Sequence, residues 1–156
     1  MKWRKLAHWL PHIPEFTHAA VPTYHHGRVY FSPRDSQGRS HIYSGSLDLQ
    51  RLEVKHLREE LTPGEPGQFD DAGCMVCDVR TDPLNVEHIY YIGWNLGVSV
   101  PFRNSLGQAS NGDKRYGPIK DRSLDDPCGV GSCWQGTRWY LSVLGWREIN
   151  GKLQPR

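Results

Sequence analysis

Two adjacent carboxylates, Asp70 and Asp71, are the side chains of this sequence best placed for acid–base or nucleophilic chemistry. They come shortly after Gly67 and lead directly into an expected strand over residues 72–76. Because successive side chains on a strand point to opposite faces, we expect one carboxylate to face a site and the other to face away. A carboxylate in such a place acts as a base, a nucleophile or a hydrogen-bond acceptor. The structural alternative is an Asx turn that caps the preceding loop.

Two arginines also lie at the ends of expected strands. Arg34, followed by Asp35, comes after a central strand, and Arg103, followed by Asn104, begins another strand. The planar guanidinium group binds carboxylates and phosphates through paired hydrogen bonds, which favours ligand contacts at these positions. The alternative for Arg34 and Asp35 is a salt bridge within the same sheet at a turn, and the alternative for Arg103 and Asn104 is a structural pair in a loop.

Trp94 and Asn95 end an expected central strand, and His18 directly precedes an expected inner strand. An aromatic face and an amide can both contact a ligand, and a residue before an inner strand can face a central channel. The alternative for Trp94 is packing, since Trp146 recurs at the same place in a later repeat. The alternative for His18 is a polar residue that is satisfied within the fold.

A repeat organises the chain. Tyr30, Tyr90 and Tyr140 mark three apolar segments at spacings of 60 and 50 residues, the scale of a propeller blade with insertions. A run of small residues precedes each segment and fits the crowded innermost strand of a blade. His25 and His26 lie in the first connecting turn, where we expect both to be solvated.

The expected elements follow from this repeat. The central strands are 28–32, 88–94 and 139–146, the inner strands are 19–21, 72–76 and 129–133, and the third strands are 40–45 and 104–109. We expect strand and loop over 52–61, and loops over 61–67, 111–118 and 121–127.

Composition narrows the class of protein. The 19 Lys and Arg against 17 Asp and Glu leave a formal charge of +2 without a basic run, which argues against nucleic-acid binding. No apolar stretch approaches the roughly 18 residues of a membrane span, so we expect a cytoplasmic protein with reduced cysteines. Cys74 and Cys77 have the spacing of a zinc knuckle, but positions i and i+3 of a strand face opposite ways. We therefore expect free thiols, with neither a metal nor a cofactor.

A set of stretches spans nearly the whole chain in a recognisable order. They are Trp3-Arg4-Lys5-Leu6, His18-Ala19 with Pro22, Val29-Tyr30-Phe31-Ser32 with Arg34-Asp35, Gly67 with Phe69-Asp70-Asp71 and Gly73, Tyr90-Tyr91-Ile92-Gly93-Trp94-Asn95, Pro101-Phe102-Arg103-Asn104, and Asp125-Asp126-Pro127 with Val130-Gly131-Ser132. Together they resemble the five-bladed β-propeller superfamily of glycoside hydrolase families thirty-two, forty-three and sixty-eight. The resemblance is closest to a glycosidase-like branch, some of whose members lie among surface-polysaccharide genes.

This resemblance implies an all-β fold, namely an incomplete five-bladed propeller of about two and a half blades. The blades would be 15–60, 68–112 and a partial third over 125–150 of a single domain. Since a propeller needs at least about four blades to close, we expect a fragment, or a partner or second copy that associates through the open blade edge.

The resemblance also implies a function: a glycoside hydrolase-like protein that acts on a glycan or glycoside at the channel mouth. Asp70 and Asp71 would be catalytic, but cleavage needs two carboxyl groups, and Gly131-Ser132 stands where the family carries a glutamate. The implied sugar-contacting residues are His18, Arg34, Asp35, Trp94, Asn95, Arg103, Asn104 and Asp126. The alternatives are a non-catalytic carbohydrate-binding or polysaccharide-assembly propeller, and an inactive truncated fragment.

Overall fold

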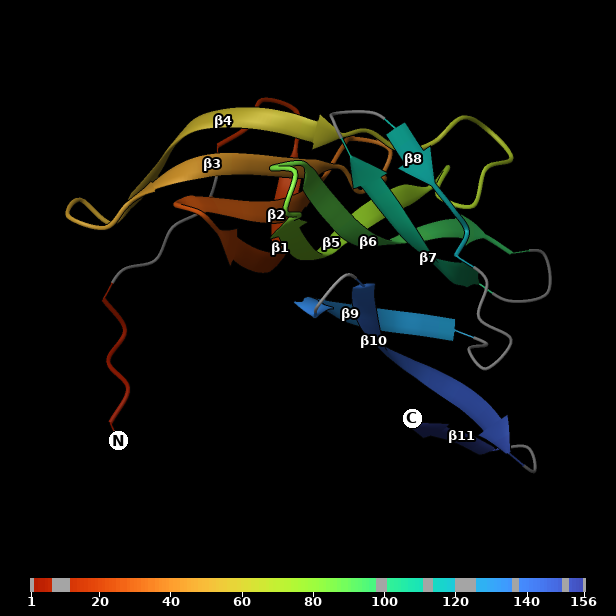
Figure 1. The fold of residues 1–156 in the computed structure, drawn as a ribbon. Helices are drawn as coiled ribbons and strands as arrows, with labels where there is room; N and C mark the ends of the chain where they lie inside the picture. The colour runs from red at the N-terminus through yellow and green to blue at the C-terminus, as the bar shows by residue number, and fades with distance from the viewer. Residues whose placement is uncertain are drawn as a thin grey trace.

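Strands make up all the regular secondary structure in the residues that the structure describes, which confirms the predicted all-β class (Figure 1). The computed structural model describes residues 2–6, 12–97, 101–110, 114–119, 126–135, 138–149 and 152–155. It describes their side chains except at 18–20, 114, 126–130, 132–135, 138–149 and 152–155. Within these ranges there is no helix long and apolar enough to span a membrane.

The strands form three antiparallel sheets, in each of which strands consecutive in sequence are neighbours. The first sheet contains β1 (Thr17–His25), β2 (Arg28–Arg34), β3 (Ile42–Asp48) and β4 (Glu53–Leu61). The second contains β5 (Gly73–Thr81), β6 (Glu87–Leu96), β7 (Phe102–Ser110) and β8 (Lys114–Tyr116). The third contains β9 (Asp126–Gln135), β10 (Arg138–Ile149) and β11 (Lys152–Pro155).

The strand predictions are largely confirmed. The three central strands lie within β2, β6 and β10, and the inner strands within β1, β5 and β9 apart from Ala72, which precedes β5. The segment 52–61, expected as strand and loop, forms β4 from Glu53 onward. Two loop predictions are wrong in part, because β8 lies inside 111–118 and β9 already begins at Asp126. β8 is a short edge strand of charged and aromatic residues, and it carries no hydrophobic alternation that a sequence pattern could reveal.

The antiparallel order brings the starts of odd-numbered strands and the ends of even-numbered strands to a common edge. Thr17, at the start of β1, pairs with Arg34 at the end of β2. In the second sheet Trp94 of β6 pairs with Gly73 on one side and with Asn104 on the other. The sheets also meet through their first strands, since β1 contacts β5 and β5 contacts β9. Residues far apart in the sequence therefore gather at this edge.

The core lies on both faces of β6. Ile89 and Tyr91 belong to a cluster with residues of the first sheet, whereas Tyr90 and Ile92 belong to a second cluster on the opposite face. None of the four is more than 6% exposed. A strand that is covered on both faces must be apolar along its whole length, which accounts for the unbroken apolar run in the sequence.

The thiols of β5 point to opposite sides, as strand alternation predicts. Cys74 is part of the first cluster, and Cys77 packs against the second. Burial raises the pKa of the Cys74 thiol, which disfavours the reactive thiolate. The described residues contain no group of three or more His, Cys, Asp or Glu side chains arranged to hold a metal ion.

His25 is buried, so the prediction that it is solvated is wrong. Its side chain is 8% exposed, its Nε2 lies 2.8 Å from Thr81 Oγ1 of the second sheet, and its ring stacks on His26. Burial and the neighbouring His26 lower the pKa of His25. The local sequence shows the turn, but only the tertiary structure places the second sheet against it. His26 itself is exposed, as predicted.

Tyr30 links the first two sheets. Its side chain is fully buried, and its hydroxyl donates a hydrogen bond to Glu87 Oε2 at 2.8 Å. We expect Tyr30→Phe to lower the free energy of unfolding by about 1–1.5 kcal/mol, because a hydrogen bond to a partly solvated carboxylate is lost without leaving a cavity. Urea unfolding measures the difference. Tyr24→Phe is the matched control, since Tyr24 is 61% exposed on β1. Equal midpoints for both variants would contradict the prediction.

Candidate functional site

Trp94 is the residue around which the predicted site residues gather, because its side chain lines two neighbouring pockets. Gly73, its partner on β5, makes room for the indole. A side chain at position 73 would place Cβ 2.6 Å from Trp94 Nε1 and 2.5 Å from the backbone nitrogen of Ser40. Gly73 also has a φ of +148°, which side-chain-bearing residues rarely adopt, so glycine is required here twice over.

The first pocket, called the Arg34 pocket, has a volume of about 440 Å³ and is lined by Arg34, Met75, Trp94, Phe102 and Asn104. The guanidinium carbon of Arg34 lies 5.6 Å from the centroid of the Trp94 ring, within cation–π range. Phe102 is 52% exposed, so the pocket offers open aromatic surface. The structure thus brings together Arg34, Trp94 and Asn104, which the sequence analysis selected separately.

The second pocket, called the Asp71 pocket, lies beside the same tryptophan and has a volume of about 590 Å³. Its lining residues are Gln37, Arg39, Gly67, Asp71, Ala72, Trp94, Asn95 and Leu96. Asp71 Oδ2 accepts a hydrogen bond from the Gly67 backbone N–H at 2.8 Å, so Asp71 closes the loop as well as lining a pocket. Among the described residues that line the two pockets, Asp71 is the only carboxylate.

Asp70 has a different environment from its neighbour. Its side chain is 0% exposed, and its Oδ2 accepts hydrogen bonds from Arg115 Nη1 and from the Tyr91 hydroxyl, both at 2.9 Å. Burial and the carboxylate of Asp70 together raise the pKa of Tyr91, which keeps that hydroxyl protonated and donating. Arg115 Nη2 also donates to the carbonyl and hydroxyl oxygens of Thr62. Asp70 therefore joins β8 to the turn before β5, while Asp71 is the carboxylate that lines a pocket.

Asp35 is engaged within the protein rather than with Arg34. Its carboxylate accepts hydrogen bonds from the Arg39 side chain at 2.9 Å and from the Gln37 backbone at 2.9 Å, and it lies 3.2 Å from His41 Nε2. Burial raises the pKa of Asp35, but these hydrogen bonds outweigh burial and hold the pKa below its usual value. The structural alternative given for this position, a salt bridge within the first sheet at a turn, is formed by Asp35 with Arg39.

The structure does not place the side chains of the remaining predicted residues, Arg103, His18 and Asp126, in either pocket. Arg103 is exposed on β7, where it pairs with Asn95, and it lines neither pocket. His18 begins the inner part of β1 and Asp126 begins β9, but their side chains lie outside the described residues. Sequence reasoning missed Met75 and Phe102, whose only signal was their position beside strand ends.

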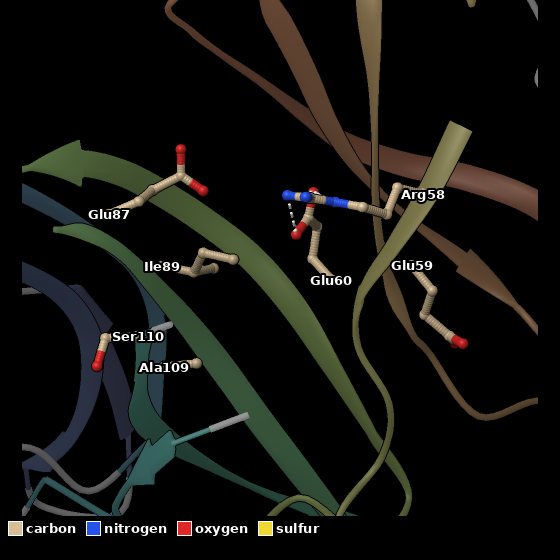
Figure 2. A pocket seen from close by; sticks show the side chains of 7 residues that line it. All are labelled: Arg58, Glu59, Glu60, Glu87, Ile89, Ala109 and Ser110. Carbon is tan, nitrogen blue, oxygen red and sulfur yellow. Dashed lines mark hydrogen bonds and ion pairs between the residues drawn. The ribbon is translucent and has the colours of Figure 1, made fainter. Parts of the chain in front are cut away.

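A third cleft lies between the first two sheets and was not predicted from the sequence. Figure 2 shows Glu87 and Ile89 of β6 opposite Arg58 and Glu60 of β4, in a cleft of about 400 Å³. The charged groups already have partners: Arg58 Nη2 lies 2.8 Å from Glu60 Oε2, and Glu87 accepts from Tyr30. Glu59, also at the cleft, lies 2.6 Å from His41 Nδ1. We interpret the cleft as part of the polar interface between the two sheets rather than as a ligand site.

Two curated relatives from Mycobacterium tuberculosis are similar to this chain: Uncharacterized protein MT1551 (strain CDC 1551 / Oshkosh) and Uncharacterized protein Rv1502 (strain ATCC 25618 / H37Rv). Each is 36% identical over 174 residues, an alignment that covers 95% of this chain and 57% of the relative. The chain thus spans little more than half the length of these relatives. No family model matches the chain, and no solved structure matches it.

Proposed function

We propose that this chain binds a carbohydrate at the two pockets beside Trp94, as part of a propeller-like protein of the glycosidase type. The observation that carries the proposal is the meeting of Arg34, Trp94 and Asn104 around one open pocket. Sugar rings have apolar faces that stack on aromatic rings, and their hydroxyls bind amide and charged groups. The volumes, about 440 and 590 Å³, lie within the roughly 300–1,000 Å³ of small-molecule sites.

The sheet arrangement supports the propeller part of the proposal. Two four-stranded meanders and a third sheet follow one another along the chain, and their first strands adjoin. Radially repeated four-stranded meanders whose first strands surround an axis are the architecture of a propeller.

Hydrolysis is a second candidate function, and Asp71 is the observation that favours it. The side chain lines a pocket beside the proposed sugar platform, and one of its oxygens is held by Gly67. A held carboxylate with a second oxygen directed at bound sugar can serve as a general base or nucleophile. Cleavage also requires a second carboxyl group, about 5–9.5 Å away depending on stereochemistry. The sequence analysis identified no residue for this second role, and Asp71 is the only carboxylate among the described residues that line the two pockets.

Substitution of Trp94 tests the binding proposal. After a glycan array has identified a bound sugar, we expect Trp94→Ala to weaken its binding by about 30-fold, the effect of truncating an aromatic hot spot worth about 2 kcal/mol. Trp94→Phe should retain most of the affinity because it keeps an aromatic face. Isothermal titration calorimetry measures both effects, and thermal melting shows whether each variant folds.

Tyr116→Ala is the matched control for Trp94→Ala. Tyr116 is 56% exposed on β8 and lines neither pocket, so its removal should leave sugar affinity unchanged. If the wild-type chain bound no glycan, or if both alanine variants lost affinity equally, the proposed function would be wrong.

A further inference from the structure

Arg34 has an unusual setting for an arginine at a pocket. Its guanidinium group lies over the Trp94 ring, and the residue is exposed at the end of β2. A cation held over an aromatic face keeps its planar edge free for a ligand. Trp94 therefore orients a positive charge at the pocket where we propose that the sugar binds.

No carboxylate of the described residues pairs with this charge. Asp35, its neighbour in sequence, is bound by Arg39 and approached by His41. Asp71 lines the other pocket beside Trp94. An arginine has five N–H donors, and within the described part of the chain none of those of Arg34 is used in a hydrogen bond.

The rest of the Arg34 pocket is neutral. Met75, Trp94 and Phe102 provide apolar walls, and Asn104 provides an amide. A cation that no described carboxylate neutralises gives the pocket a positive potential that attracts anions, and salt screens this potential because the pocket is open.

We infer that the carbohydrate bound here is an acidic one, whose carboxylate or phosphate group binds Arg34 while its ring packs against the aromatic walls of the pocket. The inference rests on the proposed function and narrows its ligand class. A guanidinium group binds either anion through two parallel hydrogen bonds, whereas a neutral sugar would leave the charge without a counterion. The two anions share this chemistry, and matched ligands can distinguish them.

Matched acidic and neutral sugars test the inference. Calorimetry on the full chain would compare glucuronate with glucose, galacturonate with galactose, and a hexose phosphate with its parent hexose. We expect at least one acidic member to bind about 10-fold more tightly than its neutral partner, the size of one charge-assisted hydrogen-bonded contact. The preference should decrease with added salt, because the contact lies at an open pocket. The pair with the larger difference identifies carboxylate or phosphate as the recognised group.

Arg34→Gln should remove this preference by bringing the acidic and neutral affinities to within about 2-fold of each other. Arg51→Gln is the control, because Arg51 is exposed in the connection between β3 and β4 and lines neither pocket. Thermal melting would verify that both variants fold.

The outcomes separate the inference from the proposed function. If the wild-type chain binds neutral sugars as tightly as acidic ones, the inference is overturned and carbohydrate binding stands. An acid preference that persists in Arg34→Gln also overturns it, because another residue would then recognise the anion. Binding of no sugar of either kind overturns both.

Discussion

Replacing Arg115 by alanine is expected to lower the free energy of unfolding by about 3–5 kcal/mol, since it leaves a buried carboxylate without its cationic partner. Asp70 is 0% exposed, and Arg115 Nη1 lies 2.9 Å from its Oδ2. The remaining described donor to that oxygen is the Tyr91 hydroxyl, which cannot neutralise a charge. Because Arg115 belongs to β8, the variant should also loosen this strand from the sheet.

Thermal and urea unfolding would measure the loss. For a chain of this size each kcal/mol corresponds to roughly 2–4 °C, so we expect the melting temperature to fall by about 6–20 °C. Arg103→Ala is the matched control: Arg103 lies on the adjacent strand β7 but is exposed, and its removal should change stability by less than about 0.5 kcal/mol.

A double-mutant cycle connects the effect to the Asp70–Arg115 pair. Asp70→Asn removes the buried charge, so Arg115→Ala should cost much less in that background than in the wild type. If the two substitutions were additive, the stability loss would come from some other contact of Arg115, and the structural role assigned to Asp70 would be wrong.

Replacing Asp71 by asparagine is expected to reduce glycoside turnover by about 10²–10⁴-fold if the chain is a hydrolase, the usual contribution of a positioned acid or base. The amide oxygen of asparagine can still accept the hydrogen bond from the Gly67 N–H, so the loop and the pocket should keep their shape. The decrease should therefore appear in kcat, with a smaller change in KM.

The assay would follow para-nitrophenol release from α- and β-glycosides of hexoses, pentoses and uronic acids. Glu65→Gln is the control, because Glu65 is an exposed carboxylate in the same loop and lines neither pocket. Full turnover by Asp71→Asn would remove Asp71 from the chemistry. Binding of a glycan without release from any probe would instead favour the non-catalytic form of the proposed function.

The sequence predicted the strands better than it predicted the contacts between them. Apolar runs such as Ile89–Ile92 are visible because a strand covered on both faces is apolar throughout. The short strand β8 was missed because its stability comes from pairing with β7 and from the distant contact between Arg115 and Asp70. Neither source leaves a periodic pattern in residues 114–116.

The same difference holds for the predicted site residues: the sequence predicts that they lie together, but it does not predict the contacts of each one. Their common location follows from the antiparallel order of strands, which places strand ends distant in sequence at one edge. Their individual environments do not follow from it. His25 was expected in solvent and is buried against Thr81. Asp35 was expected to contact a sugar, with a salt bridge at the turn as the alternative, and it forms that salt bridge with Arg39.

By itself, the sequence determined the all-β class, the repeat, and the set of polar and aromatic residues at strand ends, because each depends on local pattern and chain order. It named Asp70 and Asp71 together and could not divide their roles. Only the tertiary structure did so, by burying Asp70 against Arg115 and leaving Asp71 beside Trp94 at a pocket. The physical reason is that burial and ion pairing arise from segments about 45 residues apart, here residues 70 and 115, which no local pattern relates.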